Sequence, residues 1–66
     1  MNEQEVKKLH EKIKDEVAVF HLNANLMAND GNKSAGRRSR QSTLKLQKLF
    51  LEWRKVTVEK KVYPEA

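Results

Sequence analysis

The first part of the chain places an apolar residue at every third or fourth position. That spacing draws one narrow stripe along a helix. The pattern predicts a helix over about residues 3–28, with Glu3 and Glu5 near its N-terminus, where the helix dipole favours acids. The stripe consists of Val6, Leu9, Ile13, Val17, Phe20, Ala24 and Met27.

A second apolar set begins in the same segment and projects on the opposite face: Val19, Leu22 and Leu26. A helix that is apolar on two faces is typical of an element buried from two sides. One neighbouring helix cannot cover both faces. The pattern therefore predicts contact with a second copy of the chain.

The strongest turn signal is the segment 29–33, which opens with Asn-Asp-Gly-Asn. Gly31 is suited to a left-handed helix C-cap, and Asn32 or Ser34 can cap a following helix. Because so short a connection makes consecutive helices antiparallel neighbours, it predicts a helical hairpin.

A second helix is predicted over about residues 34–62, followed by a short tail, 63–66, because Pro64 disfavours helical geometry in the residue before it. One face of this helix should pack on the first stripe. It gathers Ala35, Ser42, Leu46, Leu49, Phe50, Trp53 and Val56.

The opposite face of the second helix mixes basic and aliphatic residues on one ridge. Leu44, Leu51 and Val58 stand seven residues apart, as in a heptad repeat. A chain of 66 residues without cysteine has a marginal core by itself. We therefore expect one all-α domain, an antiparallel helical hairpin that dimerises into a four-helix bundle or coiled coil. The predicted oligomer interface is Val19, Leu22, Leu26, Leu44, Leu51 and Val58.

The net charge of +5 is unevenly distributed. Residues 1–30 sum to −2 and residues 31–66 to +7, with no acid between Asp30 and Glu52. A segregated basic half indicates a polyanionic partner, either nucleic acid or an anionic membrane surface. The simpler interpretation is a solvated, solubilising surface.

The basic residues concentrate in the first turns of the second helix, where the helix dipole also favours an anion. Arg and Lys contacts to phosphate carry no sequence information, so non-specific binding to DNA, or to RNA, is expected. The predicted DNA-binding residues are Lys33, Arg37, Arg38, Arg40, Lys45 and Lys48. Gly36, within this cluster, indicates either tolerance near a frayed helix end or a close approach of the backbone to another helix or a phosphate.

Nothing in the sequence resembles a catalytic site. His10 and His21 would lie about 16 Å apart along a helix, too far for a shared metal, and no phosphate-loop or dinucleotide motif is present. Trp53 and Phe50 lie within the apolar face, which favours core positions over base stacking. We therefore expect no enzyme, cofactor, metal or small-molecule ligand, no membrane span, and a location in the cytoplasm, at the nucleoid.

The second half of the chain resembles the N-terminal module of the chlamydial-type bacterial linker-histone-like nucleoid proteins. The likeness rests on four segments: 31–35 (GNKSA), 37–40 (RRSR), 44–48 (LKLQK) and 53–55 (WRK). The first helix matches only in length and polarity. The resemblance implies a DNA-compacting protein without marked sequence preference, in a short form that lacks the long basic tail of the chlamydial members.

Two other functions remain open from the sequence. The leucine ridge could be a groove for an acidic protein partner, which would make the chain a structural coiled-coil or adaptor module. Alternatively, basic residues that flank apolar ones could place a helix on a membrane surface, although the hairpin signal argues against it.

Overall fold

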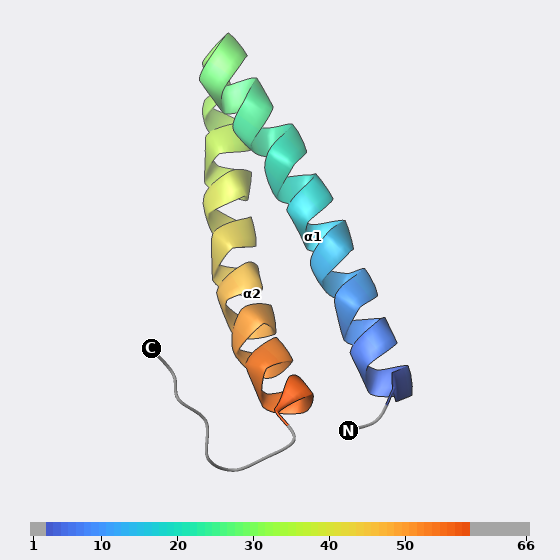
Figure 1. The fold of residues 1–66 in the computed structure, drawn as a ribbon. Coiled ribbons are helices and arrows are strands. Elements are labelled where there is room, and N and C mark those ends of the chain that lie inside the picture. Colours follow the sequence, from blue (N-terminus) through green and yellow to red (C-terminus); the bar gives the residue numbers. More distant parts are fainter. Residues whose placement is uncertain (1–2, 59–66) are drawn as a thin grey trace.

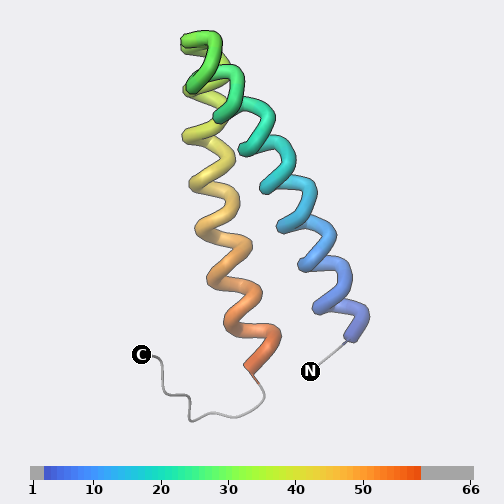
Figure 2. The backbone as a smooth tube through the Cα atoms, turned by 45° about the horizontal axis from the view of Figure 1, so that its top comes forward, coloured from blue at the N-terminus to red at the C-terminus, as the bar shows by residue number. Residues whose placement is uncertain are grey.

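The computed structural model describes residues 3–58, which form two antiparallel helices. Helix α1 runs over Glu3–Asp30 and α2 over Lys33–Thr57. Figures 1 and 2 show a hairpin whose helices are closest near the turn and diverge toward the open end. The all-helical hairpin predicted from the sequence is therefore confirmed.

The turn consists of Gly31 and Asn32 and is stabilised on both sides. Gly31 has φ +66°, and its N–H donates to the Met27 carbonyl at 3.0 Å, which is the αL type of helix C-cap. The Asn32 side chain accepts a hydrogen bond from the Ala35 N–H at 3.0 Å and caps α2. Both predicted caps are confirmed.

The taper of the hairpin follows from the size of its interhelical residues. Near the turn, Ala35, Gly36 and Ser42 are buried and allow the backbones to approach closely. Toward the open end, Leu9, Leu46 and the half-buried Trp53 occupy the interface and require more space. Side-chain volume along the seam thus sets the angle between the helices.

The buried face of α1 differs from the predicted stripe. It includes half-buried Glu16 and buried Asn23, whereas Val17 and Met27 each remain 42% exposed. The reason is that the contact line follows Leu9, Glu16 and Asn23, seven residues apart, and Val17 lies one residue, about 100°, around the helix. On α2 the predicted packing face is confirmed except that Phe50 is 46% exposed.

The second helix ends at Thr57, and Val58 follows as an extended C-cap residue. This end is earlier than the predicted one near residue 62. The rest of that predicted segment and the tail 63–66 lie outside the described residues. Within the described part of the chain, neither helix is long and apolar enough to cross a membrane.

The predicted oligomer-interface residues mostly face solvent in the single chain. Val19, Leu22, Leu44 and Leu51 are exposed, while Leu26 and Val58 are half-buried. The buried apolar residues are only Leu9, Ala35 and Leu46 in the described segment. Dimerisation through these residues remains a prediction.

Candidate nucleic-acid interface

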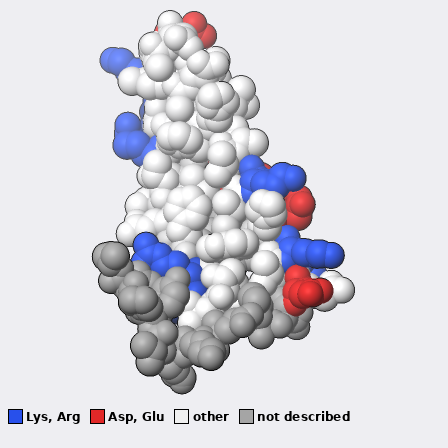
Figure 3. Space-filling view, viewed as in Figure 1, with Lys and Arg blue, Asp and Glu red and all other residues white. Residues whose placement is uncertain are grey.

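A row of cations runs along the outer side of the first turns of α2. Lys33, Arg37 and Arg40 are all exposed, and steps of four and three residues place them on one helical face. That face is opposite the buried residues Ala35, Ser42 and Leu46 and so points away from α1. Figure 3 shows basic side chains projecting from this outer edge in the upper half of the hairpin. We call Lys33, Arg37 and Arg40 the basic ridge.

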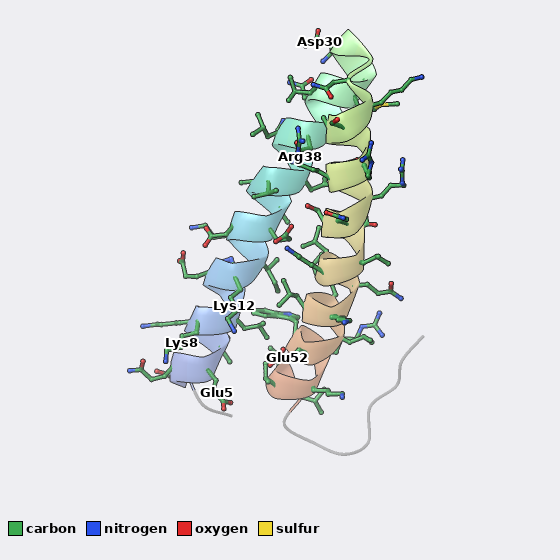
Figure 4. All side chains as sticks on the ribbon, turned by 180° about the vertical axis from the view of Figure 1, so that it is seen from behind. Glu5, Lys8, Lys12, Asp30, Arg38 and Glu52 are labelled. Carbon is green, nitrogen blue, oxygen red and sulfur yellow. The ribbon has the colours of Figure 1, made fainter. Side chains whose placement is uncertain are left out.

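Arg38 has a different position from its neighbours. It lies on the flank of α2 that faces α1, and its Nε donates to Asn23 Oδ1 at 2.9 Å (Figure 4). Asn23 is 5% exposed, and its Nδ2 donates to the Val19 carbonyl at 3.0 Å, so both ends of the buried amide are satisfied. Because a guanidinium has five N–H donors, the two terminal amino groups of Arg38 remain available to an anion.

Lys45 and Lys48 lie in a mixed-charge environment. They line an open groove of about 450 Å³ between the helices, together with Asp15, Glu16 and Glu52. Lys12 and Leu49 complete its lining. Three carboxylates near these lysines oppose the approach of another anion. The structure therefore separates the six predicted residues into the basic ridge, the anchored Arg38 and two lysines beside acids.

The basic ridge has fewer acids around it than the groove that contains Lys45 and Lys48. No acid occurs in the first turn of α2, and the helix dipole contributes positive partial charge at this end. Asp30, the last residue of α1, stands at the tip of the hairpin (Figure 4) and is the nearest acid in the sequence. The site is suited to anion binding by its charge and exposure.

Two hydroxyl groups and one imidazole make contacts within the hairpin. Ser39 Oγ donates to the Gly36 carbonyl at 2.7 Å, and Thr43 Oγ1 donates to the Arg40 carbonyl at 2.6 Å. The His10 ring lies 6.1 Å, centroid to centroid, from the Trp53 ring across the helix interface. Among residues 3–58, no group of three His, Asp or Glu side chains could hold a metal ion.

Gly36 lies close to α1. It is buried, and a Cβ built there would lie 2.7 Å from Met27 Sδ. Its burial favours a close approach to another helix over tolerance near a frayed helix end.

Two interactions of the site were not anticipated from the sequence. They are the Arg38–Asn23 hydrogen bond and the acids around Lys45 and Lys48. Asn23 could have indicated the first of these interactions. It interrupts the apolar spacing of α1, and a buried amide requires a polar partner. The identity of that partner depends on the register between the helices.

Comparison with known proteins supports the resemblance found in the second half of the chain and extends it over the first. The family model described as histone H1-like protein Hc1 matches residues 5–62, a span that includes nearly all of α1, the turn and all of α2. Neither a curated protein nor a solved structure matches the chain. The match covers most of the 66 residues, and the chain therefore belongs to the histone H1-like Hc1 family.

Proposed function

We propose that this protein binds duplex DNA without sequence specificity, through phosphate contacts made by the basic ridge. The observation that carries the proposal is the alignment of Lys33, Arg37 and Arg40 on one exposed face of α2. Three cations in a row can each neutralise a backbone phosphate, and release of the condensed counterions drives such binding.

Membership of a histone H1-like family supports this assignment, since that family packages DNA and is not an enzyme family. The shape of the site supports it as well. A convex helix surface with Lys and Arg offers contacts to backbone phosphates, which position a protein but do not read bases. The place of action is then the nucleoid.

The proposal includes a homodimer that holds two basic ridges. Two linked sites raise the overall affinity by effective concentration and can bridge DNA segments. Arg38, with its terminal amino groups available, would add to each site. Lys45 and Lys48 would contribute less, because of the acids beside them.

The test is a salt titration of binding to random-sequence duplex DNA, followed by fluorescence anisotropy. Each phosphate neutralised contributes about −0.9 to the slope of log K against log salt concentration. The variant K33E/R37E/R40E is expected to lose most of the affinity and to flatten the slope. It leaves Arg38 and its bond to Asn23 in place.

The matched control is K7E/K8E/K12E, which changes the net charge equally but alters α1. If only the net charge mattered, both variants would lose the same amount of DNA affinity. That result would refute the assigned site. Repeating the titration with double-stranded RNA determines which nucleic acid is preferred.

A second candidate function rests on the exposure of Leu44 and Leu51 on the outer side of α2. Two leucines one heptad apart can enter the groove of a protein partner, and the surrounding cations favour an acidic one. Retained DNA affinity in L44S/L51S, together with loss of a protein complex, would support this function as an additional one.

A further inference from the structure

One broad face of the hairpin carries apolar side chains and little charge. Ile13, Val17 and Phe20 contribute from α1, and Phe50 and Trp53 from α2; we call these five residues the apolar face. Figure 3 shows an uncharged area in the upper and central part of the face seen in Figure 1, with charged side chains beside and below it. The groove lined by Lys12 and Glu52 opens on the other side, which Figure 4 shows.

The apolar face is only partly covered in the single chain. Val17 and Phe50 are nearly half exposed, and His10, Ile13, Phe50 and Trp53 line an open depression of about 210 Å³. In the described residues, no large side chain is fully buried. A layer one helix thick cannot enclose its own apolar side chains, so a second layer is required for a core of ordinary density.

We propose that a second copy of the chain covers this apolar face, with the twofold axis parallel to the helices. The inference rests on the proposed dimer and assigns its interface, which differs from the one predicted from the sequence. An axis in this direction places α1 of each copy against α2 of the other.

The charges of the helices favour this arrangement over the alternative. Helix α1 has four lysines and six acids, whereas α2 has eight Lys and Arg residues and a single Glu. An axis perpendicular to the helices would place the two basic α2 helices side by side, where like charges repel. The parallel axis pairs each basic helix with an acidic one.

The leucine ridge is less suited to the interface because Leu44 and Leu51 alternate with Arg40, Lys48 and Lys55 along the same face. Burying this ridge would require cations to be removed from water without a matching acid. With the apolar face buried instead, the two basic ridges lie on opposite outer sides of the bundle. Each is then free to contact a separate DNA segment.

The experiment measures the mass of the protein by sedimentation equilibrium over a dilution series. The wild type is expected to be a dimer, with twice the 7.7 kDa mass of the chain. The variant V17D/F50D is expected to be a monomer. The control L22D/L44D adds the same charge at the two most exposed leucines and is expected to remain a dimer.

Trp53 provides a second measurement on the unmodified protein, because it is the sole tryptophan and belongs to the apolar face. Its emission is expected to shift to longer wavelength as dilution dissociates the dimer. An emission maximum that does not move across a dissociation seen by sedimentation would refute this interface, even if V17D/F50D failed to fold.

The outcomes separate the interface from the proposed function. A dimeric V17D/F50D, or a monomeric L22D/L44D, overturns the assigned face and leaves the dimer and DNA binding intact. A wild type that is monomeric throughout overturns the dimer as well. Loss of DNA binding in K33E/R37E/R40E tests the basic ridge independently of both.

Discussion

The Nε of Arg38 lies 2.9 Å from Oδ1 of Asn23, and this hydrogen bond connects the cationic segment of α2 to the buried seam of the hairpin. Asn23 is the largest buried polar residue in the described segment, and its amide has a partner at each end. Arg38 therefore has a structural role, although the residue as a whole remains exposed. The same side chain is therefore a structural contact and one of the proposed DNA-binding residues.

Removing Arg38 is expected to destabilise the hairpin. In R38A the buried Asn23 Oδ1 loses its partner, which costs about 1–2 kcal/mol in the free energy of unfolding. The double variant N23L/R38A is expected to be more stable than the sum of the single changes predicts, because no orphaned acceptor remains. Urea denaturation of the four proteins measures the coupling. R37A, which removes an equal charge from the outer side, is expected to change stability by less than about 0.5 kcal/mol.

The lysines in the mixed-charge groove are expected to matter less for DNA than the basic ridge. K45Q/K48Q removes two charges that lie near Asp15, Glu16 and Glu52. K33Q/R37Q removes two from the start of α2, whose first turn contains no acid. Each lost phosphate contact lowers the salt slope by about 1, so the ridge variant should lose about two units and the groove variant less. If anisotropy titrations gave equal losses of salt slope for the two variants, the nearby acids would not reduce the contribution of Lys45 and Lys48 to DNA binding.

Substitution of Gly36 is expected to depend on Met27. Alanine is favoured over glycine inside a helix by about 1 kcal/mol, but the new Cβ would meet Met27 Sδ at 2.7 Å. In the M27A background the contact is absent, and G36A is expected to give the full stabilisation. In the wild-type background displacement of Met27 reduces the gain. Thermal unfolding followed by circular dichroism compares the two, and identical shifts in both would contradict the close approach.

Gly31 is expected to be sensitive to substitution because of its backbone conformation alone. A Cβ at this position would meet nothing within 4 Å, but φ is +66°. G31A is therefore expected to cost about 1–2 kcal/mol, and G31N less, since asparagine tolerates the left-handed region better. The measurement is the midpoint of thermal unfolding. A lower midpoint for G31N than for G31A would exclude conformational strain as the cause.

The sequence was sufficient for the architecture because its signals are local. Gly31 and Asn32 specify the turn through their own backbone and side-chain preferences, and the apolar spacing of α2 identifies its packing face apart from Phe50. These properties need no knowledge of the partner helix.

The details of the seam could not be predicted from local patterns. Asn23 and Glu16 replace Val17 on the packed face because the register between the helices determines the contact line. The register also determines that Arg38 reaches Asn23 and that acids of α1 stand near Lys45. Such relationships arise only when both helices are placed together.

The division of charge between the two helices also affects how the chain approaches its partner. Because α1 has a net negative charge and α2 a large net positive charge, the hairpin has an electric dipole across its width. In the field of a polyanion this dipole orients a single hairpin before contact, with α2 toward the polyanion. In the proposed dimer the two dipoles point in opposite directions and cancel, so this orienting effect belongs to the dissociated chain. The field extends about 10 Å at 0.1 M salt, and within that distance productive collisions become more frequent than random orientation allows.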